Sequence, residues 1–319
     1  MNMTKILAND GIDTAGKEKL EAAGIEVDTS FIPQEELADK LNDYDAILVR
    51  SATKVRKELI DACPNIKLIG RGGVGMDNID VEYARSVGRQ VSNTPAASSF
   101  SVAELVFAHL YTGARFLHDA NRQMPKSGNT DFKGLKKAYA KGIELRGKTL
   151  GIIGFGRIGQ AVATIALGSG MKVLAYDKFP KTANLEIDVA DQKVNVNIEP
   201  VSLDEVLKNS DFITLHVPFS AGETPTIGKE ELSLLKEGSF LIHCGRGGAV
   251  DEVALLDALN SDKIAFAGLD VFENEPTPNE ALLKHPKVSA TPHIGGSTVE
   301  AQERIGLEIA DIIIDYFKK

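Results

Sequence analysis

Three charged side chains have the types and settings needed to handle a small carboxylic acid. Arg246 stands among glycines in Gly245–Gly248, where its planar fork could hold a carboxylate with two hydrogen bonds. His293 lies just past a strand-like segment, where an open α/β sheet binds ligands, and its imidazole could take up and return a proton. Glu275 lies in a short acidic segment. Each also fits a plainer role, as a surface arginine, a structural histidine or a solvated acid.

The other histidines have weaker claims to chemistry. His109 and His118 fall in a long helical pattern, where packing or surface roles are the default. His285 looks like a loop residue. His216 stands at the end of a predicted strand, and His243 lies on the predicted strand that precedes Arg246.

A phosphate-binding turn is predicted at Gly154–Gly159, which matches G-x-G-x-x-G and joins an apolar strand at 150–153 to a helix. The first glycine permits a tight turn, the second lets the backbone approach a pyrophosphate, and the third allows close packing of helix on strand. The start of the helix would offer free N–H groups to the anion. The residues expected at the dinucleotide are Gly154, Gly156, Arg157, Ile158 and Gly159.

The next predicted strand ends at Asp177, about 20 residues beyond the last glycine, as this fingerprint requires. Its carboxylate would accept hydrogen bonds from the adenosine ribose and repel a 2′-phosphate, which favours NAD over NADP. Lys178 and Lys181 leave NADP open. The pattern also permits a tight turn that binds no ligand.

A second glycine match, at Gly70–Gly75, lacks this context because no acid ends the following strand at Ser92. It is interpreted as a turn whose bare N–H groups face a small anion, with a plain glycine turn equally open.

Two series of alternating strands and helices must position these residues, and such alternation predicts parallel sheets with covered faces. The first series covers about 95 residues and the second begins at Lys148. Between them, 98–118 is predicted to be one long buried helix and 124–146 a polar surface connection. Strands are expected at 4–9, 45–50, 66–70, 90–92, 149–153, 172–176, 211–217, 239–244, 264–269 and 288–290.

Composition excludes several classes of protein. A chain of 319 residues fits two domains, and its net charge of −9 argues against general nucleic-acid binding. No apolar run reaches the ~20 residues that span a bilayer, and the first residues do not resemble a signal peptide, so the cytoplasm is expected. Cys63 and Cys244 lie far apart and support neither a disulfide framework nor a metal site.

Together these motifs resemble the D-isomer-specific 2-hydroxyacid dehydrogenase family over nearly the whole chain. The matching segments are Gly154–Gly159, Gly245–Glu252, Gly268–Pro276 and Thr291–Thr298. The resemblance implies that Arg246 clamps the substrate carboxylate, that His293 is the acid/base, and that Glu275 hydrogen-bonds His293. Further cofactor contacts are expected at His216, Pro218, Cys244, Asp270 and Gly296. The family often has Asn at position 243 and Ala or Ser at position 245, so this chain departs from it there.

The resemblance also implies two Rossmann-like or flavodoxin-like parallel-sheet domains with a cleft between them. Residues 1–97 plus 294–319 would form a discontinuous substrate-binding domain, and 98–293 an NAD-binding Rossmann domain. A homodimer is expected, with the helix at 98–118 in the contact. The chain ends soon after His293, so the regulatory domain of longer family members is expected to be absent.

Within the family, Arg50–Val55, Gly73–Asp80 and Asn93–Pro95 are most similar to the D-3-phosphoglycerate dehydrogenase branch. A phosphate in a net-acidic protein needs a local cation, which Arg50 could supply unless it pairs with a surface acid. N–H groups of Val74 and Gly75 could help to bind the carboxylate. The substrate residues expected are Arg50, Ser51, Val74, Gly75, Asn93 and Arg246, with Lys136, Lys137 and Lys141 as further cations of undecided origin.

The resemblance therefore implies NAD-dependent oxidation of 3-phospho-D-glycerate to 3-phosphohydroxypyruvate, which begins serine biosynthesis. Two alternatives stay open. One is a hydroxypyruvate/glyoxylate reductase or a D-lactate dehydrogenase, which would differ in the pocket around Arg50. The other is an NAD(H)-sensing binding protein or corepressor, against which Arg246, Glu275 and His293 argue.

Overall fold

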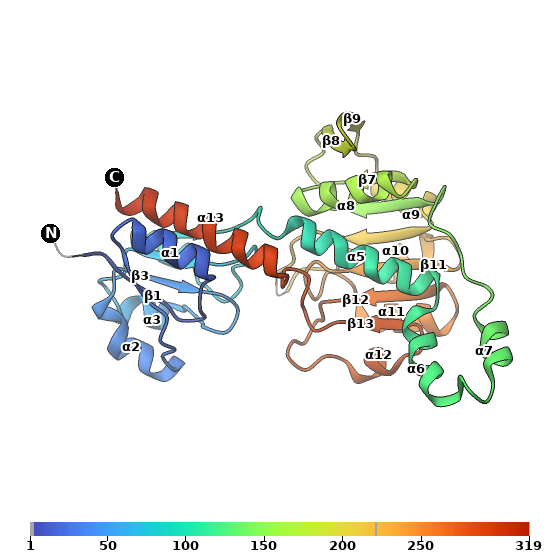
Figure 1. Ribbon diagram of the computed structural model, residues 1–319, viewed down its shortest axis with the longest axis horizontal. Helices are drawn as coiled ribbons and strands as arrows, with labels where there is room; N and C mark the ends of the chain where they lie inside the picture. Colours follow the sequence, from blue (N-terminus) through green and yellow to red (C-terminus); the bar gives the residue numbers. More distant parts are fainter. Residues whose placement is uncertain (1–2, 221, 319) are drawn as a thin grey trace. The chain divides into compact units, whose positions relative to one another are not determined.

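The computed structural model describes residues 3–220 and 222–318. Its internal contacts divide the chain into two compact units (Figure 1). The first contains the residues up to Ser99 and returns from Gly296 onward, and the second is Phe100–Gly295. Each junction lies two residues beyond the boundary that the sequence suggested. Within the described ranges, no helix combines the length and apolarity needed to cross a membrane.

The first unit is built on a five-stranded parallel sheet with the order β2-β1-β3-β4-β5, which is flavodoxin-like. Its strands are β1 (Lys5–Ala8), β2 (Glu26–Asp28), β3 (Ala46–Val49), β4 (Leu68–Arg71) and β5 (Gln90–Asn93). Its α-helices are α1 (Thr14–Ala22), α2 (Leu37–Lys40), α3 (Lys57–Ala62), α4 (Val81–Ser86) and α13 (Val299–Phe317). The core side chains of α2, α3 and α4 cover one face of the sheet, and those of α1 and α13 cover the other.

Helix α13 brings the end of the chain back to the first unit, where it lies beside α1 (Figure 1). The two helices approach most closely at Gly16 and Gly306. A Cβ atom on Gly16 would lie 2.4 Å from the Gly306 carbonyl oxygen, so a larger residue there would force the helices apart. This contact explains why a segment so distant in sequence completes the first unit.

The second unit contains a six-stranded parallel sheet with the order β13-β12-β11-β10-β6-β7. Its strands are β6 (Thr149–Ile153), β7 (Lys172–Tyr176), β10 (Phe212–Leu215), β11 (Ser239–His243), β12 (Ile264–Leu269) and β13 (Val288–Ala290). Its helices are α5 (Ser99–Ala114), α6 (Leu117–Ser127), α7 (Phe132–Ala138), α8 (Arg157–Gly168), α9 (Leu203–Asn209), α10 (Lys229–Leu234), α11 (Glu252–Asn260) and α12 (Glu280–Lys284). The strand order reverses at β6, between β7 and β10, which is where an open α/β sheet binds its ligand.

Local sequence accounts for most of these elements. The inner strands of both sheets are short apolar runs with almost fully buried side chains, as parallel sheets covered on both faces require. Several helices begin at a side chain that accepts a backbone N–H of the first turn: Asp13 for α1, Ser202 for α9, Asp251 for α11 and Thr298 for α13. One face of the second sheet packs on α5 and α8, and the other on α9, α10 and α11.

The single helix predicted over 98–118 is wrong only at its C-terminal end. Helix α5 ends at Ala114, and Phe116 adopts a left-handed conformation with φ of 55° before α6 begins at Leu117. The polar connection predicted over 124–146 is also wrong in part, because α6 extends to Ser127 and α7 follows it. Polarity alone misled the prediction, since a helix at the surface needs few apolar residues.

Two strands and their turn were not predicted at all. β8 (Ala183–Val189) and β9 (Gln192–Ile198) form an antiparallel two-stranded ribbon between β7 and α9 (Figure 1). Alternating Ala183 and Leu185 are buried while their neighbours are exposed, which is the period-two pattern of a half-buried strand. The short edge strand β2 was missed as well.

Candidate active site

The glycine turn at Gly154–Gly159 leaves β6 and forms the start of α8. Gly154 has φ of +92°, and a Cβ atom there would lie 2.7 Å from the carbonyl group of His216. A Cβ atom on Gly159 would lie 2.2 Å from the Gly154 carbonyl oxygen. A Cβ atom on Gly156 would meet nothing within 4 Å. The outer glycines are therefore required by the fold, whereas the middle glycine faces open space at a helix N-terminus, as a pyrophosphate site demands.

Asp177 follows β7 and supports this turn from the side. Its carboxylate accepts the N–H of Phe155 at 2.7 Å and that of Phe179 at 2.8 Å. Both bonds come from backbone groups, so the carboxylate is held in place at the edge of the glycine turn. This is the position from which an acid reaches the adenosine ribose of a dinucleotide.

Two histidines at the ends of β10 and β11 have pKa values below the ordinary value for an imidazole. Burial, reinforced by the neighbouring imidazole of His243, lowers the pKa of His216 to about 3. Burial also lowers the pKa of His243 to about 4, although its bond to the Arg246 carbonyl opposes the shift. The Nδ1 atom of each ring is buried and has no hydrogen-bond partner within the described residues. Cys244 lies beside them, and burial raises the pKa of its thiol well above the usual value, as expected of a packing residue.

The turn after β11 presents Arg246. The Nε2 atom of His243 lies 2.9 Å from the Arg246 carbonyl oxygen, so the buried ring fixes the backbone of this residue. A Cβ atom on Gly247 would lie only 1.8 Å from the Phe272 carbonyl oxygen. The glycine therefore lets the Arg246 turn approach the segment that follows β12, which carries Glu275.

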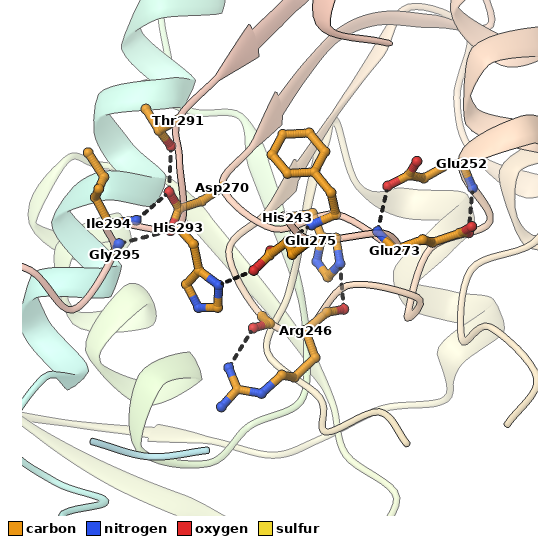
Figure 2. A network of polar contacts seen from close by, with 12 residues as sticks. His243, Arg246, Glu252, Asp270, Glu273, Glu275, Thr291, His293, Ile294 and Gly295 are labelled. Carbon is orange, nitrogen blue, oxygen red and sulfur yellow. Dashed lines mark hydrogen bonds and ion pairs between the residues drawn. The ribbon is translucent and has the colours of Figure 1, made fainter. Parts of the chain in front are cut away.

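Glu275 and His293 form a hydrogen-bonded pair next to Arg246 (Figure 2). The His293 Nδ1 atom lies 2.8 Å from the Glu275 Oε2 atom, and the Glu275 Oε1 atom accepts the Phe272 N–H at 3.0 Å. Burial alone would raise the pKa of Glu275, but the bond to His293, the charges of His293 and Arg246 and the Phe272 N–H together lower it. An ionised Glu275 must accept from Nδ1–H, which leaves Nε2 of His293 free to exchange a proton.

The segment carrying Glu275 is tied to the start of α11 by two carboxylates (Figure 2). Glu273 accepts the Glu252 N–H at 3.2 Å, and Glu252 accepts the Glu273 N–H at 2.8 Å. Burial, assisted by the charge of Glu273, raises the pKa of Glu252 although its bond to the Glu273 N–H opposes this. The Glu252–Glu273 pair therefore links the start of α11, which follows the Arg246 turn, to the segment that carries Glu275.

Asp270, at the end of β12, anchors the segment on both sides of His293. It is 1% exposed and accepts the Thr291 hydroxyl at 2.6 Å, the Ile294 N–H at 2.9 Å and the Gly295 N–H at 2.8 Å. His293 itself has φ of 53°, in the left-handed region that a β-substituted residue rarely occupies. The three bonds hold the histidine in this conformation.

Apart from Arg246, the residues expected at the substrate lie in the first unit, at the carboxyl ends of β3, β4 and β5. The Arg50 N–H donates to Asp10 at 2.6 Å, and the Arg50 guanidinium contacts Gln302 rather than a surface acid. Ser51 is exposed in the same loop. Asn93 donates its side-chain amide to the Val74 carbonyl at 2.6 Å and so holds the turn that contains Val74 and Gly75.

The structure thus gathers the predicted residues into two groups. The second unit brings together the glycine turn, Asp177, His216 and Cys244 at one sheet edge, and Arg246, Glu275 and His293 around a common point. Pro218 is exposed in the segment after β10. Gly296 belongs to the first unit, where its carbonyl accepts the side-chain amide of Gln302 at 2.8 Å. The sequence did not reveal the anchoring roles of Asp10 and Thr291. It also did not reveal that the His109 Nε2 atom lies 3.2 Å from the Thr291 hydroxyl, although a histidine within an apolar helix signals a need for a partner.

Comparison with known proteins agrees with this geometry. Residues 107–295 match the family model described as D-isomer specific 2-hydroxyacid dehydrogenase, NAD binding domain. The chain is 42% identical over 313 residues to a hydroxypyruvate reductase of Thermotoga maritima, covering 97% of each chain. It is 43% identical over 314 residues to a D-3-phosphoglycerate dehydrogenase of Methanocaldococcus jannaschii, covering 98% of this chain but 57% of that relative.

A solved structure shows the same architecture. The cofactor (NAD+)-bound 3-phosphoglycerate dehydrogenase of Entamoeba histolytica matches with a TM-score of 0.77 and 28% identity, over 100% of this chain and 96% of that one. The family match covers more than half of the present sequence, and the relatives align along almost all of it. The chain therefore belongs to the D-isomer specific 2-hydroxyacid dehydrogenase family.

Proposed function

We propose that this protein oxidises 3-phospho-D-glycerate to 3-phosphohydroxypyruvate with NAD. The observation that carries the proposal is the His293–Glu275 pair beside Arg246. These groups match the needs of the reaction, which are a base for the hydroxyl proton, a carboxylate that orients this base, and a cation for the substrate carboxylate. Relatives named for this activity share about two-fifths of the residues along the chain.

His293 serves as the acid/base in this proposal. Its Nδ1–H donates to Glu275, so Nε2 carries the lone pair that accepts the proton from the substrate hydroxyl. The imidazolium formed in this way is stabilised by the adjacent carboxylate, and in the reverse direction it returns the proton to the carbonyl oxygen. Arg246 holds the carboxylate of the same molecule through its planar guanidinium.

The second unit fits a dinucleotide at the Gly154–Gly159 turn. Gly156 leaves room for the pyrophosphate at the N-terminus of α8, and Asp177 stands at the edge of the turn. A dinucleotide held by these residues would supply a hydride acceptor for C2 of the hydroxy acid. Asp177 favours NAD, because a 2′-phosphate would lie against its charge. Cofactor contacts from His216, Pro218, Cys244, Asp270 and Gly296 are part of the same proposal.

Recognition of the phosphate is assigned to Arg50. It follows β3 at the carboxyl edge of the first sheet, and its backbone is fixed by the Asp10 carboxylate. Ser51 adds a donor for the phosphate. The N–H groups of Val74 and Gly75, whose turn Asn93 holds, help to bind the substrate carboxylate. The side chain of Arg50 currently meets a neutral partner, Gln302, which a phosphate could replace.

Hydroxypyruvate reduction is the second candidate. It is favoured by the Thermotoga maritima relative, which matches this chain along 97% of both lengths. That reaction needs the same Arg246, Glu275 and His293 but no phosphate site. The two candidates therefore differ in whether Arg50 contributes to turnover.

Steady-state kinetics of the purified protein distinguish these candidates. Oxidation would be measured with NAD and 3-phospho-D-glycerate, D-glycerate or D-lactate, and reduction with NADH and 3-phosphohydroxypyruvate, hydroxypyruvate or glyoxylate. We expect kcat/KM to favour the phosphorylated acids by roughly tenfold or more, and Arg50→Gln to remove most of this preference. His293→Ala should abolish turnover while NAD still binds. A preference for unphosphorylated acids would reject the phosphoglycerate assignment and leave the acid/base site intact.

A homodimer is proposed through α5, α6 and α7. Large apolar side chains on these elements are exposed, namely Phe100, Tyr111, Leu117, Met124 and Phe132. Large apolar side chains that are exposed on a single chain are often covered in a subunit contact. Sedimentation velocity would show a dimer that Leu117→Lys weakens, whereas a monomer at micromolar concentration would reject this proposal.

A further inference from the structure

A part-buried chain of hydrogen bonds joins α5 to the segment that carries His293. His109, on α5, is 3% exposed. Its Nδ1 atom lies 3.1 Å from the Ser289 hydroxyl, and its Nε2 atom lies 3.2 Å from the Thr291 hydroxyl. The Thr291 hydroxyl lies in turn 2.6 Å from Asp270, which anchors the backbone on the far side of His293 (Figure 2).

The chemistry of the groups sets the direction of every bond in this chain. Asp270 accepts two backbone N–H groups and, as a carboxylate, only accepts, so the single Thr291 proton must point to it. The Thr291 oxygen then accepts from His109, which places a proton on Nε2. The bare Nδ1 of the neutral ring is left to accept the Ser289 hydroxyl. Burial favours this neutral form by lowering the pKa of His109, although the charge of Asp270 opposes the shift.

The fold makes room for the histidine at this place. A Cβ atom on Gly268 of β12 would lie 2.6 Å from the His109 Cβ atom, so any larger residue would push the imidazole away. The absence of a side chain at Gly268 lets His109 lie against the sheet beside Ser289 and Thr291, at the end of β13. Thus β12, β13 and α5 together define the position of the ring.

This series of hydrogen bonds ends at the segment that contains the strained residue His293. His293 has φ of 53°, a left-handed conformation that persists in a residue with a side chain only where the surroundings enforce it. Enforcement comes from Asp270, which holds the residue two positions before His293 and the two residues after it. The direction of the Thr291 hydroxyl is therefore part of what holds the His293 ring toward Glu275.

We propose that His109 is a positioning residue for the reaction, which acts by orienting the Thr291 hydroxyl toward Asp270 and so fixing the left-handed backbone of His293. This inference rests on the proposed role of His293 as the acid/base. His109 acts on the His293 segment through Thr291, whose hydroxyl bonds to Asp270.

Substitutions at position 109 test the role in catalysis. The amide nitrogen of Gln reaches about as far as Nε2 of His and can donate to Thr291, whereas that of Asn is too short to do so. We expect His109→Leu and His109→Asn to lower kcat roughly tenfold to a hundredfold, with KM for the hydroxy acid and Kd for NAD within about twofold of the original values. His109→Gln should restore most of the loss. Thr291→Val should reproduce the defect, and Thr291→Ser should not.

The matched control is His118→Leu, which removes a histidine from α6 whose Nε2 atom contacts the Pro286 carbonyl and not the chain to Asp270. It should leave kcat unchanged. Equal kcat in the wild-type protein and in His109→Leu would overturn the inference. So would a Gln variant no better than the Asn variant at equal melting temperature, because the defect would then reflect packing and not donation.

A spectroscopic measurement tests the chain without relying on turnover. In ¹⁵N-histidine-labelled protein, long-range ¹H–¹⁵N correlations should show His109 as a neutral ring protonated on Nε2, assigned by the loss of its signals in His109→Gln. Protonation on Nδ1 would overturn the inference. If no hydroxy acid is turned over, the proposed function fails while this result still decides the direction of the chain.

Discussion

The Nδ1 atom of His293 lies 2.8 Å from the Oε2 atom of Glu275, and the imidazole is 47% exposed while its partner carboxylate is 36% exposed. The pair is thus open on one side, so a substrate can reach the ring. The oxygen of Glu275 that does not contact His293 accepts the Phe272 N–H, which orients the carboxylate from behind. The geometry separates the two ring nitrogens into one that is held and one that can react.

Glu275→Gln should test whether Glu275 keeps the proton of His293 on Nδ1. The Gln oxygen can still accept the Phe272 N–H, but its amide group can no longer favour a proton on Nδ1 of His293. We expect kcat to fall by roughly a hundredfold or more, with KM and the melting temperature little changed. Glu280→Gln, an exposed acid on α12, is the control and should be as active as the wild-type protein. Unchanged turnover in Glu275→Gln would remove this carboxylate from the mechanism.

Substitutions at Gly156 and Gly159 should affect different properties, namely NAD affinity and stability. Gly156→Val adds a side chain to open space, so we expect a folded protein that binds NAD at least about tenfold more weakly. Gly159→Ala places a methyl group 2.2 Å from the Gly154 carbonyl oxygen and should cost about 1–3 kcal/mol of stability. Isothermal titration calorimetry and thermal unfolding measure the two effects. Normal NAD affinity in Gly156→Val would place the cofactor elsewhere.

Asp177→Asn should shift the choice of cofactor. The substitution removes the charge that opposes a 2′-phosphate, and two cations, Lys178 and Lys181, lie within four residues of it in the sequence. We expect the ratio of kcat/KM with NAD to that with NADP to fall by roughly tenfold, equivalent to about 1.4 kcal/mol. Asp188→Asn, on the exposed side of β8, controls for net charge and should leave the ratio unchanged. If Asp177→Asn leaves the ratio of kcat/KM with NAD to that with NADP unaltered, this carboxylate does not determine which cofactor is bound.

The buried histidines should make the fold sensitive to mild acid. The unfolded chain protonates them near pH 6.5, whereas burial lowers the pKa to about 4 for His243 and about 3 for His216 in the folded protein. The unfolded state therefore binds more protons between pH 6.5 and 4, so the free energy of unfolding falls as the pH falls through this window. His243→Asn removes one such group, and its melting temperature should fall less between pH 7 and 4.5. An identical fall in both proteins would contradict this origin of the pH dependence.

Much of the second unit could be predicted because its signals are local. A buried parallel strand is a short apolar run, and the Gly154–Gly159 turn needs particular residues at fixed spacing. The same holds for Asp177, whose distance from the glycines reflects one helix and one strand. Local signals failed where the chain is polar, which is why α6, α7 and the β8–β9 ribbon were not anticipated.

The sequence by itself determined the alternation of strands and helices, the glycine turn and the identity of the groups that can move a proton or hold a carboxylate, because these depend on neighbouring residues. Only the tertiary structure decided which groups meet. His109 and Thr291 are 182 residues apart, and their contact exists because α5 lies against β12 at Gly268. The burial of a side chain and the direction of its hydrogen bonds depend on such contacts between distant segments. They therefore cannot be predicted from a pattern within a short stretch of sequence.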